Sequence, residues 1–130
     1  MISLTIPIRL ISEANQRGHW RKHAQRHKSH RAIAAVMLRS VMTCRVYPPF
    51  VVTITRVAPR SLDSDNLASS AKSLRDGLAD QLQVNDNDLR IDWRYAQEKG
   101  KPGEYAVKVA ITSAATSVGE AVGIVKGSVI

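Results

Sequence analysis

The run FVVTITRV at residues 50–57 constrains the fold of this chain more than any other segment. It is rich in valine, isoleucine and threonine, whose branched Cβ atoms pack well in a pleated sheet. Pro48 and Pro49 precede the run and Pro59 follows it, and proline continues neither a helix nor a central strand. The sequence therefore predicts a β-strand at residues 50–57.

Hydrophobic spacing predicts the remaining elements. Alternating apolar residues predict strands at 2–10, 89–99 and 104–112, and the last two are expected to form a hairpin around the turn Lys101-Pro102-Gly103. Helical spacing predicts helices at about 18–43 and about 66–82. The order β-α-β-α-β-β indicates a single α+β domain over residues 1–112, with a mixed sheet packed by two helices. Residues 113–130 are expected to be a loosely ordered tail.

Length and composition limit the class of protein. A chain of 130 residues is one domain's worth, and the single cysteine, Cys44, forms no internal disulfide, so a reducing compartment is expected. The N-terminal segment has no basic residues before its apolar run, which argues against a signal peptide. No stretch approaches the roughly 20 apolar residues of a membrane helix. We therefore expect a soluble cytoplasmic protein.

Charge is distributed unevenly along the chain. The net charge is +8 and the isoelectric point about 10.2, which favours a polyanionic partner such as nucleic acid. Ten Lys or Arg residues and no acid lie between Glu13 and Asp63, whereas nine of the eleven acids lie between Asp63 and Glu104. A protein that only binds nucleic acid has no evident use for this second, acidic half.

Two aspartates two positions apart, Asp63 and Asp65, follow the predicted strand in the segment RSLDSDNL. In extended backbone, side chains at i and i+2 point to the same side, and two close carboxylates repel each other unless a cation lies between them. Mg²⁺ favours oxygen ligands, often one or two carboxylates together with substrate phosphates. The segment therefore predicts a divalent-metal site. The alternative is that Asp65 is only a helix N-cap, for which Ser64 is a rival.

A second acidic segment, NDND, follows the predicted helix at 66–82 and contains Asp86 and Asp88. A helix of about sixteen residues separates its two ends by roughly 25 Å. Asp86 therefore joins Asp63 and Asp65 within one chain only if the chain doubles back, and otherwise the three meet across a dimer. The alternative is that NDND is only a turn, because asparagine and aspartate favour turns.

The segment RGHWRKHAQRHKSHR, residues 17–31, holds six Lys or Arg residues and all four histidines. Such a density of cations repels itself unless an anion neutralises it, so we interpret the segment as contacting phosphate. His19, His23 and His27 have a helical spacing that suits zinc, but no cysteine or acid nearby completes a site. A solvated basic helix face is the remaining alternative. Trp20 is expected to anchor the helix in the core or an interface, or to stack on an unpaired base.

The run LDSDNLASSAKSLRDGLADQLQVNDND, followed by IDWRYAQEK, resembles the RusA family of Holliday-junction resolvases. The family pattern is an Asp-x-Asp-Asn-Leu segment opening a helix, a lysine on that helix, an Asp-Gly-Leu or Asp-Ala-Leu, and then an acidic turn. The resemblance extends over nearly the whole chain to about residue 112. Two positions depart from the pattern: the family lysine lies one turn earlier, where this chain has Ser69, and the acidic turn has Asn85 before Asp86.

The resemblance implies a homodimeric, Mg²⁺-dependent endonuclease that resolves four-way DNA junctions, with Mn²⁺ as a second possible metal. It implies that Asp63, Asp65 and Asp86 are the metal ligands and that Lys72 is the catalytic lysine. The basic residues expected to contact DNA are Arg17, Arg21, Lys22, Arg26, Lys28, Arg31 and Arg60. The alternatives are a non-catalytic nucleic-acid-binding protein on the same fold and a nuclease for other branched DNA.

Overall fold

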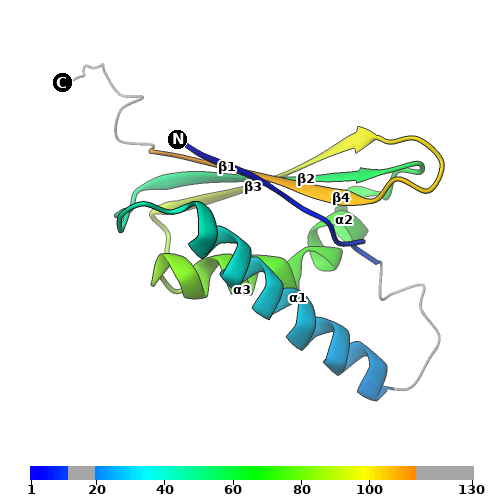
Figure 1. The fold of residues 1–130 in the computed structure, drawn as a ribbon, viewed down its shortest axis with the longest axis horizontal. Coiled ribbons are helices and arrows are strands. Elements are labelled where there is room, and N and C mark those ends of the chain that lie inside the picture. Colours follow the sequence, from blue (N-terminus) through cyan, green and yellow to red (C-terminus); the bar gives the residue numbers. More distant parts are fainter. Residues whose placement is uncertain (12–19, 114–130) are drawn as a thin grey trace.

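A computed structural model describes residues 1–11 and 20–113 as a four-stranded sheet with three helices (Figure 1). In chain order the elements are β1 (Ile2–Ile6), α1 (Trp20–Val41), β2 (Phe50–Ala58), α2 (Ser64–Ser70), α3 (Lys72–Leu82), β3 (Ile91–Lys99) and β4 (Ala106–Ser113). The prediction of a single α+β domain with a mixed sheet is confirmed, with one more helix than expected. No helix among the described residues is long and apolar enough to cross a membrane.

The strand order in the sheet is β1-β4-β2-β3. Strands β2 and β3 are parallel, and β4 is antiparallel to both β1 and β2. In the middle of the sheet, Ile54 of β2 lies opposite Tyr95 of β3 on one side and Val109 of β4 on the other. The expected hairpin between the last two strands is therefore wrong, because β2 lies between them.

The connections of β2 explain why that hairpin does not form. The α2–α3 segment returns the chain so that β3 joins β2 in parallel, as helical crossover connections do. The chain then passes the end of β2, where the Gly100 amide donates to the Ala58 carbonyl at 2.9 Å, and β4 takes the opposite edge of β2. The turn signal at residues 101–103 is present, but it joins two strands that are not neighbours.

All three helices lie on one face of the sheet, and the apolar core fills the space between the two layers (Figure 1). The largest fully buried side chains are Ile6, Leu38, Val52, Ile54, Leu74, Leu78, Leu82, Val107 and Val109. Gly77 permits the close approach of α3 to α1, because a Cβ at this position would overlap the Arg31 carbonyl oxygen and lie 2.9 Å from Ala34 Cβ.

The helix predicted at 66–82 is divided into α2 and α3 at Ala71, whose backbone has φ −92° and ψ 0°. The Ala71 amide donates to the Ala68 carbonyl at 3.2 Å, three residues back rather than four, which tightens the chain there. Alanine is the best helix former, so no local signal marks this break. Ala71 itself is fully buried, and tertiary packing, rather than propensity, places it.

Other boundaries shift by a few residues. The first strand ends at Ile6 rather than at residue 10, although Ile8 and Leu10 remain buried. The last two strands begin two residues later than predicted. The predicted helix start at Gly18 lies outside the described residues, and so does all of the expected tail except Ser113, which ends β4.

Candidate functional site

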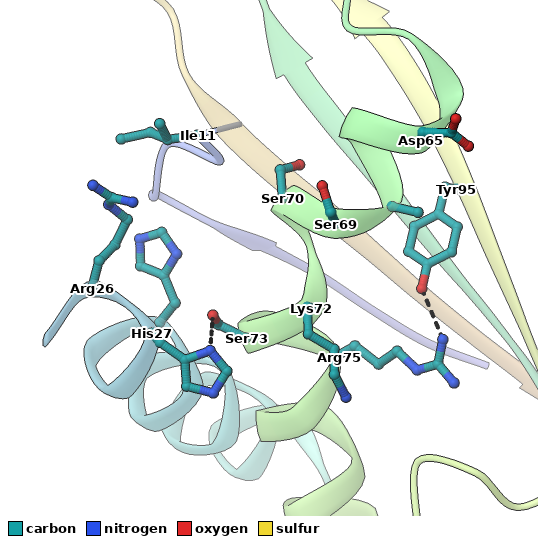
Figure 2. Close-up of a pocket in the computed structure, with 12 residues that line it drawn as sticks. Ile11, Arg26, His27, Asp65, Ser69, Ser70, Lys72, Ser73, Arg75 and Tyr95 are labelled. Atoms are coloured by element: carbon teal, nitrogen blue, oxygen red, sulfur yellow. Dashed lines mark hydrogen bonds between the residues drawn. The ribbon is translucent and has the colours of Figure 1, made fainter. Parts of the chain in front are cut away.

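A cavity of about 570 Å³ lies where α1, α2 and α3 meet and next to β3 (Figure 2). Its lining joins cationic, acidic and hydroxyl side chains from segments far apart in the sequence. These are Arg26, His27 and His30 of α1, Asp65, Ser69 and Ser70 of α2, Lys72, Ser73 and Arg75 of α3, and Tyr95 of β3, with Ile11 and Ala68. Asp65 and Lys72, two of the predicted site residues, therefore share one cavity.

Asp63 and Asp65 have different local roles. Asp63 is the N-cap of α2, because its Oδ1 accepts the Asn66 amide at 2.9 Å and its Oδ2 accepts the Asn66 side-chain amide at 3.0 Å. The proposed cap roles of Asp65 and Ser64 are therefore wrong. Since α2 already begins at Ser64, the argument from extended i, i+2 geometry does not apply to this pair.

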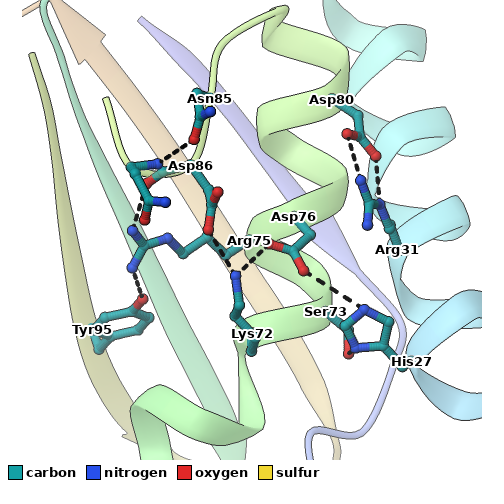
Figure 3. Close-up of polar contacts among 11 residues, drawn as sticks. His27, Arg31, Lys72, Ser73, Arg75, Asp76, Asp80, Asn85, Asp86 and Tyr95 are labelled. Atoms are coloured by element: carbon teal, nitrogen blue, oxygen red, sulfur yellow. Dashed lines mark hydrogen bonds and ion pairs between the residues drawn. The ribbon is translucent and has the colours of Figure 1, made fainter. Parts of the chain in front are cut away.

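The chain doubles back after α3 and brings Asp86 to the start of that helix (Figure 3). Gln83 ends α3 in the left-handed conformation with φ 59°, and the Val84 amide donates to the Ala79 carbonyl at 3.1 Å. Asp86 Oδ2 then accepts a hydrogen bond from Lys72 Nζ at 2.7 Å. The chain therefore doubles back as the single-chain arrangement required, but the described contact of the Asp86 carboxylate is with Lys72 and not with Asp63 or Asp65.

Lys72 connects two carboxylates, since its Nζ also donates to Asp76 Oδ1 at 2.7 Å. These two carboxylates raise the pKa of Lys72, with Asp76 contributing more than Asp86. The Lys72 ammonium in turn lowers the pKa of the Asp86 carboxyl. The cation that two neighbouring carboxylates require is supplied here by the protein itself.

Arg75 fixes the turn that carries Asp86. Its Nη2 donates to the Asp86 carbonyl at 2.6 Å, and its Nη1 donates to Tyr95 Oη at 3.1 Å. The guanidinium also lies 4.7 Å from the centre of the Trp93 ring. Arg75 thereby joins α3, the acidic turn and β3 around the cavity.

Asp88, the other acid of the NDND segment, has a local role in the same turn. It pairs with Arg90 at 2.8 Å and accepts the Arg90 amide at 3.0 Å. The Arg90 guanidinium and amide together lower the pKa of Asp88 to about 2. The turn reading of NDND therefore holds for Asp88, while Asp86 points to Lys72.

Three further side chains form a contact that the sequence did not indicate. Ser73 Oγ lies 2.6 Å from His27 Nδ1, and His27 Nε2 lies 3.6 Å from Asp76 Oδ2 (Figure 3). His27 and Ser73 are 46 positions apart, so spacing alone carries no signal for this pair. The only signal was the histidine-rich composition of the segment, which we interpreted as phosphate contact.

The predicted DNA-contacting residues do not form one surface. Arg17 lies outside the described residues. On α1, Arg21 and Lys28 are seven positions apart and therefore lie on the same side of the helix, whereas Lys22 and Arg26 lie on another side. Of these four residues, only Arg26 lines the cavity. The remaining two are Arg31, which donates to Asp80 at 2.7 and 2.9 Å, and Arg60, which lines a second cavity beside β2.

Trp20 is 67% exposed, so within the described chain it is not a core anchor. The zinc arrangement is not formed by the described residues either: His19 lies outside them, and His27 contacts Ser73 and Asp76. Within residues 1–11 and 20–113, no three His, Cys, Asp or Glu side chains are grouped so as to hold a metal ion. The described part of the chain therefore contains no preassembled site of three carboxylates.

No protein-family model matches this chain, and no curated protein matches it significantly.

Proposed function

We propose that this protein is a metal-dependent, structure-selective endodeoxyribonuclease that cuts branched DNA, with the four-way junction as its expected substrate and a homodimer as its working form. The observation that carries the proposal is that an acid, a lysine and an arginine line one cavity: Asp65, Lys72 and Arg26. Cleavage of a phosphodiester requires cations that bind its charged oxygens and an oxygen ligand that holds a metal ion. The residues that line this cavity supply both.

Each residue has a separable part in this proposal. Lys72 is more than half exposed and would donate to a phosphate oxygen as negative charge develops on it. Arg26 and His30 on α1 would orient the DNA backbone over the cavity. Asp86, held beside Lys72 by Arg75, would fix the position of the ammonium.

One carboxylate of the predicted set is placed to hold Mg²⁺ on this cavity. Asp63 caps α2, and Asp86 pairs with Lys72 and does not line the cavity, which leaves Asp65. Mg²⁺ often binds to one or two carboxylates together with substrate phosphate oxygens, and Asp65 would hold it in that way. When bound, the metal would supply an activated water for hydrolysis.

A binding protein without catalysis is the second candidate. It is favoured by the pairing of Lys72 with both Asp76 and Asp86, because these carboxylates compensate the positive charge of the lysine. In that case the cavity would only hold a phosphate, and the acidic residues would orient the lysine.

The test compares cleavage of a synthetic four-way junction, a linear duplex and a flap in Mg²⁺ and in Mn²⁺. The variants are Asp65→Asn and a matched control, Asp92→Asn, which changes an exposed aspartate that pairs with Arg94 on β3. We expect paired nicks on the junction, lost in Asp65→Asn with binding retained, and unchanged in the control. Junction binding without cutting in either metal would leave the binding protein as the correct function.

A further inference from the structure

Arg56 carries a positive charge into the interior of the protein. It lies on β2, on the strand face that packs toward the core, and its side chain is only 8% exposed. Nη1 donates to the Arg60 carbonyl at 2.6 Å and lies 3.5 Å from Gln97 Oε1, and Nε is buried without a partner. Among the described residues, no carboxylate forms an ion pair with this guanidinium.

The surroundings of Arg56 make its positive charge less favourable. Burial lowers the pKa of Arg56, and the charge of Arg9 lowers it further, with Tyr105 acting in the opposite direction. A buried charge without a counter-ion is unfavourable, and proteins normally pair such groups. A neutral carbonyl and a glutamine amide do not supply the missing negative charge.

Arg56 lines a cavity of about 390 Å³ at the carboxyl end of the parallel pair β2 and β3. Two exposed cations, Arg60 and Lys99, line the same cavity, with Ser61 and Gln97 as neutral polar groups. Its one acid is Glu98, and the Glu98 carboxylate accepts both of its hydrogen bonds from Lys108 at 2.9 Å.

We propose that this cavity binds a phosphate-type oxyanion, with the Arg56 guanidinium as its buried anchor and Arg60 and Lys99 as cations at the rim. An arginine presents its donors as a planar fork that matches two oxygens of such a group. The anion is either a free phosphate or a phosphodiester of a nucleic-acid backbone, which share this chemistry.

An occupant of this cavity would act on the segment that leads to Asp63. Gln97 accepts the Leu62 amide at 2.7 Å and donates to the Leu62 carbonyl at 2.7 Å, and Arg56 contacts the Arg60 carbonyl. An anion bound to Arg56 would therefore hold residues 60–62 against the end of β3. This site goes beyond the proposed nuclease function, since it does not require that any carboxylate cuts DNA.

The test measures binding of inorganic phosphate by calorimetry and by thermal unfolding, with chloride at matched ionic strength as the reference. Three proteins are compared: the wild type, Arg56→Met, and the control Arg94→Met, which removes an exposed arginine on β3 that pairs with Asp92. Methionine keeps most of the volume and removes the buried charge, a replacement that is often neutral or stabilising. We expect saturable stabilisation of the wild type and the control, and at least about a tenfold weaker affinity in Arg56→Met.

A second variant keeps the test decisive if Arg56→Met does not fold. Changing Arg60 and Lys99 together to Met alters only exposed side chains and should also weaken phosphate binding. An added DNA oligonucleotide identifies the source: competition with phosphate assigns the site to the backbone, and no competition assigns it to a free anion. Absence of saturable phosphate binding by the wild type, or equal binding by all variants, would overturn the proposal, and neither result depends on cleavage activity.

Discussion

Two polar regions flank the α2 helix, and they differ in whether their charged side chains have partners of opposite charge. In the Lys72 chain, made of His27, Lys72, Asp76 and Asp86, the lysine lies 2.7 Å from both carboxylates, and His27 Nε2 lies 3.6 Å from Asp76 (Figure 3). In the Arg56 region, made of Arg56, Arg60 and Lys99, the buried arginine has a carbonyl and a glutamine as its described partners.

The difference concerns what each region requires from outside the protein. In the Lys72 chain the cation is already paired with two carboxylates, so it is held in one orientation before any substrate arrives, as groups in preorganised sites are. The Arg56 region is incomplete, and its buried charge is compensated only when an anion binds. The first region is therefore built to orient a group, and the second is built to receive one.

The largest expected effect comes from removing the cation of the Lys72 chain. Lys72→Met should lower junction cleavage by roughly 10²- to 10³-fold, because a donor aimed at the developing charge is lost. Single-turnover cleavage at saturating protein measures this, with DNA affinity determined in parallel. Arg94→Met, which removes an exposed cation that pairs with Asp92 on β3, is the control and should cut normally. Unchanged cleavage by Lys72→Met would remove Lys72 from the mechanism.

A smaller effect should follow from releasing the turn that carries Asp86. Arg75→Leu removes two hydrogen bonds, to the Asp86 carbonyl and to Tyr95 Oη, and should destabilise the protein by about 1.5–3 kcal/mol. Urea unfolding monitored by Trp93 fluorescence measures this free energy. Arg90→Leu, which changes an exposed arginine in the same turn, is the matched control and should destabilise the protein less than Arg75→Leu does. Equal losses in the two variants would show that Arg75 does not anchor the turn.

The smallest expected effect is a difference between the two regions in how their contribution to stability depends on pH. The pKa of Asp86 is lowered by Lys72, so its ionised form stabilises the folded protein above the ordinary value of 3.8, and this contribution is lost as the pH falls through the lowered pKa. The unfolding midpoints of the wild type and Asp86→Asn should therefore differ at neutral pH and converge in acid. Arg56→Met should show no such convergence, because no carboxylate pairs with Arg56 among the described residues. A wild-type advantage that persists in acid would contradict the lysine pairing.

Local sequence patterns predicted the elements well because each depends on neighbouring residues. The β-branched run at 50–57 is the central strand β2, and the leucine spacing after residue 66 is helical. The break at Ala71 was missed, because it is imposed by packing on a residue that favours helix. The predicted hairpin failed for a related reason: strand pairing is decided by the whole sheet, and a turn signal reports only that the chain reverses.

The sequence by itself determined the α+β class and the acidic turn. It also placed Asp65 at the start of the helical segment, Lys72 within that segment and Asp86 in the turn after it. Only the tertiary structure decided which of these residues meet. Lys72 lies fourteen positions from Asp86 and reaches it because Gln83 reverses the chain, while Asp63 turns to Asn66 instead. The His27–Ser73 contact and the unpaired Arg56 likewise depend on segments brought together by folding. Charge balance is a property of neighbours in space, and spacing along the chain does not reveal it.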